Sequence, residues 1–259
     1  MKYLKTALPW GFLALAITTL WLLMLFPAQL LYRFVPGELR ESLSFSIQQL
    51  QGTLWQGRAI RPATSQVQLD QLEWNLSPSS LLVLQPAMTF SATGMGATLS
   101  GHSVFSDNSL HLSNIQGQGE LSELFAVVAQ GLPRNSLSAF GSQLASGVEG
   151  QLALELEELQ IDEKGCELLK GKMLFNEVAV PLWPEKVDLE ATLSCIGNAL
   201  VIQITDTGDL SLKARLRVEP DGRYSLIGSL APSDPEQLNL IRLTGAEERN
   251  GRFEFESRG

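Results

Sequence analysis

The chain has 259 residues, a net charge of −9 and an isoelectric point near 4.8. Nucleic-acid binding requires a basic surface, and adhesion to anionic lipid headgroups requires basic clusters, so this composition argues against both. The chain contains only two histidines, which excludes a histidine-rich metal site, and we expect no metal and no cofactor.

The first predicted element is an uncharged run of residues that begins at Leu8 and ends at Leu31. About 20 apolar residues are enough to cross the hydrocarbon core of a bilayer. Trp10 and Trp21 lie in the run and are suited to anchoring at membrane interfaces. The run therefore predicts an uncleaved membrane anchor. A cleaved signal peptide is the alternative, but its apolar region would be shorter and followed by a small-residue cleavage site. A buried core helix is a second alternative, which the length of the run argues against.

The charges around this run predict its orientation. Lys2 and Lys5 precede it on a short tail, and basic tails stay in the cytoplasm. We therefore expect a cytoplasmic tail over residues 1–7, the anchor over 8–31, a juxtamembrane segment over 32–42, and a domain over 43–259 on the far side. In a Gram-negative bacterium this places the protein in the inner membrane, with the domain in the periplasm.

From residue 43 onward, apolar and polar residues alternate with a period of two, which is typical of half-buried strands. Residues 67–76 predict a strand with a bulge near Asp70 and Gln71, where the alternation changes phase, and 77–80 predict a turn or a single helical turn with Ser77 as its cap. Residues 83–93, 97–105 and 109–116 predict further strands. Residues 120–130 have helical spacing, and the Ser-, Gly- and Ala-rich stretch near 134–149 is a candidate boundary between two halves.

The second half has the clearer pattern. Residues 187–195, 200–204 and 210–218 alternate with one apolar face, and a short helix is expected to begin near Asp234. The predicted fold class is mainly β, with a transmembrane helix followed by one large, curved antiparallel sheet and a few short helices.

Cys166 and Cys195 both lie beyond the predicted anchor. Two such cysteines usually pair in an oxidising compartment, so we expect a disulfide. Two buried free thiols, normal in a cytosolic protein, are the alternative.

We find no residues that predict catalysis. His102, Asp107 and His111 are close in sequence, but they lie in segments rich in Ser and Asn, which favours a solvated surface. Catalytic triads are defined by geometry rather than by closeness along the chain. Trp55 and Trp183 are left as candidate partner contacts, whereas Trp74 is in phase with Leu72 and Leu76 and is expected in the core.

Several segments carry a resemblance to a known family. They are residues 50–59 (LQGTLWQGRA), 72–78 (LEWNLSP), 224–232, 243–245 and 250–253, together with the two cysteines. In these the chain resembles the N protein family of the bacterial type II secretion system. The resemblance implies a non-enzymatic inner-membrane component that supports export of folded proteins across the outer membrane. It implies contacts with other secretion components, namely the inner-membrane platform and the outer-membrane secretin complex.

A second resemblance exists at the level of the fold. Recurrent Gly-x-Leu strand starts in a membrane-anchored sheet are similar to AsmA-type lipid-transfer proteins, which implies an apolar groove for lipid. Because a fold alone does not establish function, this remains the alternative hypothesis.

Overall fold

The computed structural model describes residues 15, 18–19, 21–22, 24–30, 46–64, 68–106, 108–124, 147–179, 185–206, 208, 211–231, 247–249 and 251–258. The elements are β1 (Ser46–Gly52), β2 (Gln56–Ala63), β3 (Gln71–Leu76), the 3-10 helix η1 (Pro78–Val83), β4 (Ala87–Gly94), β5 (Ala97–Ser106), β6 (Ser109–Glu120), β7 (Glu149–Asp162), β8 (Gly165–Ala179), β9 (Val187–Ile196), β10 (Ala199–Asp206), β11 (Lys213–Val218), β12 (Tyr224–Leu230), β13 (Glu247–Arg249) and β14 (Arg252–Arg258).

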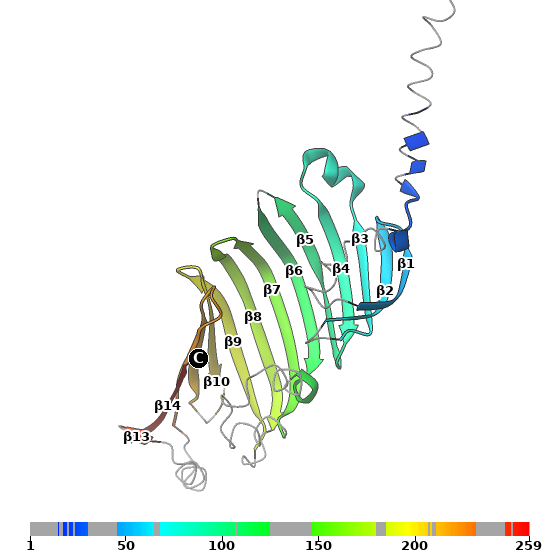
Figure 1. The fold of residues 1–259 in the computed structure, drawn as a ribbon. Coiled ribbons are helices and arrows are strands. Elements are labelled where there is room, and N and C mark those ends of the chain that lie inside the picture. The colour runs from blue at the N-terminus through cyan, green and yellow to red at the C-terminus, as the bar shows by residue number, and fades with distance from the viewer. Residues whose placement is uncertain are drawn as a thin grey trace, which may run out of the picture.

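Within these residues, fourteen strands form one antiparallel sheet, and each strand from β1 to β11 pairs with the next along the chain. The order changes only at the last edge, where β14 lies between β12 and β13. Figure 1 shows a curved sheet that runs from β1, beside the N-terminal segment, to the β13–β14 hairpin. Because β6 pairs directly with β7, the strands before and after residues 121–148 belong to one sheet.

The register shows why this chain forms a sheet with two different faces. Residues opposite each other on paired strands share a face, and neighbours along a strand point to opposite faces. One row of paired residues crosses the whole sheet and is apolar throughout: Leu50, Ala59, Leu72, Ala92, Leu99, Gly117, Leu154, Met173, Ala191, Ile204, Ala214, Gly228 and Phe255. We call the side that carries this row the apolar face.

The row displaced by one residue is polar except at one position. It holds Gln51, Arg58, Glu73, Ser91, Ser100, Gln116, Glu155, Lys172, Thr192, Gln203, Arg215, Ile227 and Glu256. We call this side the polar face. Lys172 Nζ and Glu155 Oε2 form an ion pair of 3.0 Å across β7 and β8 on it. The two rows keep their character from β1 to β14, although the register shifts at irregularities in the β5–β6, β7–β8 and β8–β9 pairs.

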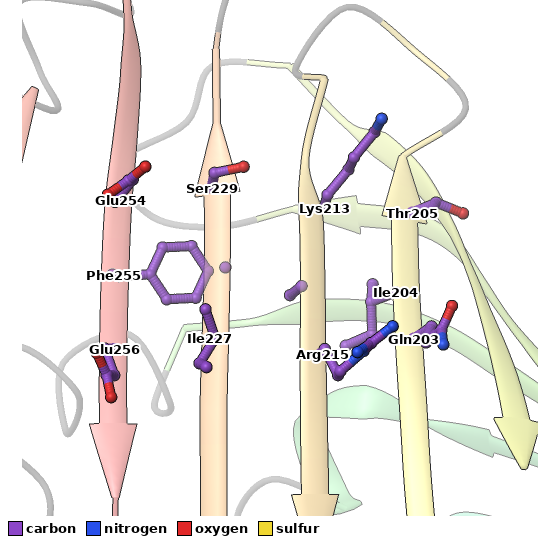
Figure 2. A pocket seen from close by; sticks show the side chains of 12 residues that line it. Gln203, Ile204, Thr205, Lys213, Arg215, Ile227, Ser229, Glu254, Phe255 and Glu256 are labelled. Carbon is purple, nitrogen blue, oxygen red and sulfur yellow. The ribbon is translucent and has the colours of Figure 1, made fainter. Parts of the chain in front are cut away.

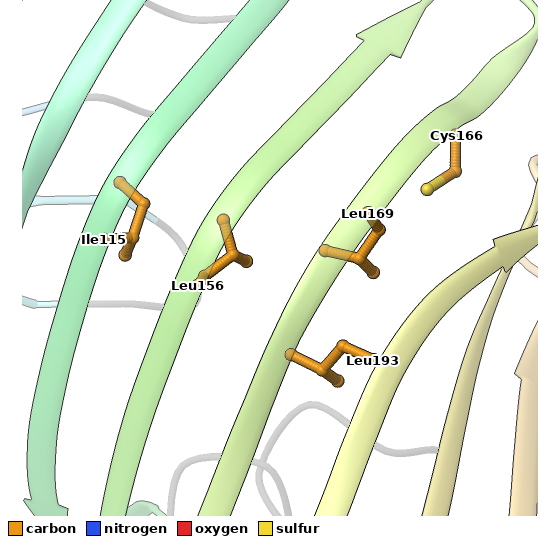
Figure 3. Close-up of a cluster of buried hydrophobic side chains, with 5 residues drawn as sticks. All are labelled: Ile115, Leu156, Cys166, Leu169 and Leu193. Atoms are coloured by element: carbon orange, nitrogen blue, oxygen red, sulfur yellow. The ribbon is translucent and has the colours of Figure 1, made fainter.

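The core lies on the apolar face over β6, β7, β8 and β9. Ile115, Leu156, Cys166, Leu169 and Leu193 form a buried cluster there (Figure 3). A glycine on the neighbouring strand makes room for it. A Cβ atom at Gly101 on β5 would lie 2.0 Å from Ile115 Cδ1, so only glycine lets the isoleucine side chain occupy that space.

The mainly β, antiparallel fold expected from the sequence is confirmed. Two local expectations were wrong. Residues 83–86 belong to η1 and the turn after it rather than to a strand, and β4 begins at Ala87. Ser77 precedes η1, but its side chain does not cap the helix, since its Oγ lies 2.9 Å from Ser79 Oγ.

Three predicted segments lie wholly or partly outside the described residues. The helix predicted over 120–130 is helical at 121–124, where its description ends, and the helix predicted near Asp234 is not described. Of residues 8–31, the structure describes only part. No helix among the described residues is both long and apolar enough to cross a membrane.

Candidate functional site

The two histidines lie on neighbouring strands of the polar face. His102 on β5 pairs with Thr89 and Ser113, and His111 on β6 pairs with Gln160. None of these partners supplies the carboxylate that orients a catalytic imidazole. Asp107 lies outside the described residues. Among the residues that are described, no group of three His, Cys, Asp or Glu side chains could hold a metal ion.

The tryptophans differ in their surroundings. Trp74 lies on the apolar face with its ring over Gly57, where a Cβ atom would be 2.5 Å from Trp74 Cζ2. Its Nε1 donates a hydrogen bond of 3.0 Å to the carbonyl of Leu54. Trp74 is half-buried and belongs to neither buried cluster, so it packs on the first strands of the sheet rather than in the core. Trp55 is half-buried in the β1–β2 turn, and Trp183 lies outside the described residues, so both stay predictions as partner contacts.

The disulfide between Cys166 and Cys195 is present and joins β8 to β9, as the sequence predicted. The two Cα atoms are 5.7 Å apart, within the usual range for a disulfide. Cys166 belongs to the buried cluster, and the bond joins residues that are 29 positions apart in the chain. The disulfide therefore joins β8 to β9 at the end of the buried cluster that lies beside the β7–β8 turn.

A hollow of about 690 Å³ lies over β10, β11, β12 and β14 (Figure 2). Its lining includes two cations, Lys213 and Arg215, and two anions, Glu254 and Glu256. Ile227, the one apolar member of the polar row, lies among them and is 53% exposed. The lining also includes Ile204, Ala214 and Phe255 of the apolar row, so the hollow combines apolar and charged side chains.

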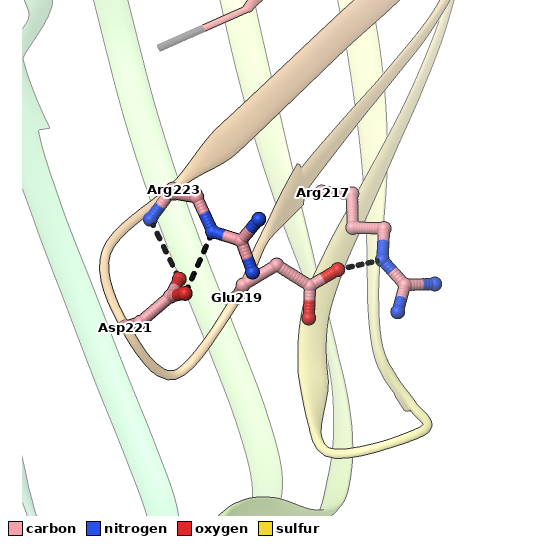
Figure 4. Close-up of polar contacts among 4 residues, drawn as sticks. All are labelled: Arg217, Glu219, Asp221 and Arg223. Carbon is pink, nitrogen blue, oxygen red and sulfur yellow. Dashed lines mark hydrogen bonds and ion pairs between the residues drawn. The ribbon is translucent and has the colours of Figure 1, made fainter.

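The turn between β11 and β12 is held by two ion pairs (Figure 4). Arg217 Nε lies 2.6 Å from Glu219 Oε1, and Arg223 Nε lies 2.6 Å from Asp221 Oδ2. The backbone N–H and then the guanidinium of Arg223 lower the pKa of the Asp221 carboxyl. The charged side chains of Asp221 and Arg223 in the β11–β12 turn are therefore in contact with solvent.

The β1–β2 turn lies at the same end of the strands as the β11–β12 turn, but it makes contacts of a different kind. The β1–β2 turn contacts the N-terminal segment, because Leu54 N–H donates to the Phe26 carbonyl at 3.1 Å. Gln29 Nε2 donates to the Leu50 carbonyl at 2.7 Å, and Ala28 between them is only 4% exposed. Beside this contact, η1 and the residue after it present exposed apolar side chains, a feature that the sequence analysis did not find. The feature in the sequence that could have indicated this surface is the run of four apolar residues at 81–84.

The fold and the surfaces thus define a β-sheet protein built from one alternating sheet, without an assembled catalytic or metal group among its described residues. A family model described as type II secretion system (T2SS), protein N matches residues 44–256, and the chain belongs to this family.

Individual relatives agree. The chain is 30% identical to type II secretion system protein N of Klebsiella pneumoniae over 99% of this chain and 97% of that protein. It is 25% identical to the protein N of Aeromonas hydrophila over 92% of each chain, and 26% identical to that of Pectobacterium carotovorum subsp. carotovorum over 77% of each. No solved structure gives a significant match. These comparisons confirm the resemblance to protein N and give no support to the AsmA-type resemblance.

Proposed function

We propose that the protein is a non-enzymatic component of the type II secretion system that acts from the inner membrane through periplasmic contacts with other components. The observation that carries this proposal is the similarity to the Klebsiella pneumoniae protein N over nearly the full length of both chains. Because the match is not confined to one segment, it supports a shared role for the whole protein.

Membrane anchoring is supported by the sequence and by local contacts. The uncharged run over 8–31 has the length of a membrane span, and basic residues precede it. Near the end of this run, Phe26 is hydrogen-bonded to Leu54 in the β1–β2 turn and Gln29 to Leu50 in β1. The domain would then sit directly against the membrane, with the first strands nearest to it.

Contact with proteins, rather than catalysis, is supported by the nature of the surfaces. The polar face carries the Lys172–Glu155 ion pair, and the exposed Ile227 lies on it among charged side chains, which makes Ile227 a candidate contact position. Trp55 lies at the β1–β2 turn near the proposed membrane, where other inner-membrane components would meet it. Trp183 is the second proposed contact.

The test is a deletion of the gene in the native host, followed by complementation. One exported enzyme is measured in the medium and in the periplasm, and detergent sensitivity reports the state of the outer membrane. We expect the enzyme to accumulate in the periplasm behind an intact outer membrane, and the wild-type gene to restore export. Normal secretion with a leaking outer membrane would contradict the proposal and favour lipid handling.

A further inference from the structure

The connection between β3 and β4 ends in an exposed apolar tip. Leu81, Leu82, Val83 and Leu84 are 38, 87, 66 and 86% exposed, and we call these four residues the apolar tip. Isolated exposed apolar residues are common, but four consecutive ones form a contiguous patch that usually marks a contact with lipid or protein. None of the four is needed to fill the core.

The backbone of the tip is closed by its own hydrogen bonds. Leu84 N–H donates to the Leu81 carbonyl at 3.1 Å, and Gln85 N–H donates to the Ser80 carbonyl at 3.1 Å. Ser80 Oγ accepts from Ala87 N–H at 2.9 Å and donates to the Ser77 carbonyl at 2.6 Å. Lipid cannot satisfy backbone polar groups, so a segment that enters a bilayer must satisfy them internally. In the tip and the turn after it, the backbone N–H groups of Leu84, Gln85 and Ala87 are satisfied by hydrogen bonds within the segment.

Leu84 also adopts a conformation that disfavours leucine. Its φ of 56° and ψ of 26° lie in the left-handed region, where glycine or asparagine is the usual residue after a helix. This conformation ends η1 and leaves the Leu84 side chain 86% exposed, so the leucine adds to the apolar surface of the tip.

The position of the tip identifies the surface that it meets. Leu76, at the end of β3, donates its N–H to the Trp55 carbonyl at 2.6 Å, and the adjoining Leu54 bonds to Phe26. The apolar tip and the end of the N-terminal segment therefore lie at the same end of the sheet. Figure 1 shows the η1 connection and the N-terminal segment rising from that end.

We propose that the apolar tip inserts into the lipid bilayer beside the N-terminal anchor and forms a second membrane contact. This rests on the membrane anchoring in the proposed function. The two contacts together would fix the orientation of the first strands relative to the membrane. A single anchor would leave the domain free to rotate about the anchor. Charge supports lipid over a protein partner. No Asp, Glu, Lys or Arg occurs between Glu73 and Asp107, although the chain as a whole carries −9.

The turns further along the same end support this assignment. The β7–β8 turn carries Glu163 and Lys164, and the β11–β12 turn carries the ion-paired Asp221 and Arg223. Charged side chains are costly to place in lipid. Only the part of this end that lies near the anchor is suited to the bilayer, so the sheet would tilt away from the membrane toward β12.

The experiment uses the full-length protein in vesicles of phosphatidylethanolamine and phosphatidylglycerol. Leu82→Cys and, in a second protein, Val83→Cys are labelled with a polarity-sensitive fluorophore; Cys166 and Cys195 are paired and stay unlabelled. Ile227→Cys is the matched control, since it is also an exposed apolar residue but lies within the polar face. Leu22→Cys reports on the anchor. Vesicles with brominated acyl chains quench any label that reaches the hydrocarbon.

We expect the labels at Leu82 and Val83 to emit at shorter wavelength and to be quenched by brominated chains, while the label at Ile227 does neither. If the labels at both tip positions emit as they do in water while the label at Leu22 is quenched, the tip proposal is overturned and the anchoring stands. A water-like label at Leu22 would overturn both. Labels at the tip that are shielded only after other secretion proteins are added would assign the tip to a protein partner, and so would also overturn the proposal.

Discussion

The disulfide offers a quantitative test of the structure. Replacing Cys166 and Cys195 together by alanine removes the bond and little else, because only two sulfur atoms are lost from the core. The bond joins residues 29 positions apart, and the chain-entropy model gives about 3.6 kcal/mol for a loop of that length. Since single domains are stable by roughly 5–15 kcal/mol, the double variant would lose a quarter or more of its stability.

The assay is urea unfolding of the full-length protein in detergent micelles, followed by tryptophan fluorescence. We expect the double variant and the reduced wild-type protein to unfold at the same, lower urea concentration. A reductant should not change the double variant, which is the control. A difference of less than about 1 kcal/mol between the oxidised wild-type protein and the double variant would refute the reasoning.

Three further predictions concern the sheet and its surfaces. Trp74→Ala removes the ring over Gly57 and a hydrogen bond, and should lower the free energy of unfolding by about 3 kcal/mol, whereas Trp74→Phe should cost about 1 kcal/mol. Equal losses in urea unfolding would contradict this packing. Asp221 has a folded-state pKa below its ordinary value of 3.8, so its contribution to stability is present above that pH and is lost as the pH falls through the lower folded value. The urea midpoint should fall in that acid range, and Asp221→Asn should weaken this response; an unchanged acid response would argue against the Arg223 contacts. His102→Ala and His111→Ala should leave secretion in the native host at wild-type level, and a loss of export with either variant at normal protein abundance would revive a catalytic role.

Much of the fold could be predicted because one physical rule governs most of the chain. An antiparallel sheet with one apolar face requires alternation, which residues 187–195 show throughout and residues 200–204 show except at Val201. The structure pairs them as β9 and β10, with Leu193 opposite Ile202. The disulfide was predictable for a different reason, namely the oxidising compartment that the anchor implied.

The remaining features depend on neighbours that are distant in sequence. Nothing local to Gly101 indicates that Ile115 needs its space, since that contact follows from the register of β5 and β6. The apolar tip escaped prediction because a short apolar run is also what a buried strand looks like. Pro86 and the left-handed conformation of Leu84 end the run before a strand can form, and the four side chains stay exposed.

The central claim is that the protein works by touching other type II secretion components. The most direct measurement is site-specific photo-cross-linking in living cells, with the full-length protein at its native level. The cross-linking residue is placed in turn at Trp55, at Ile227 and at exposed positions on both faces of the sheet. The account predicts adducts that contain another secretion component from at least one of these positions. No such adduct from any position, in a strain that still exports its enzymes, would contradict it.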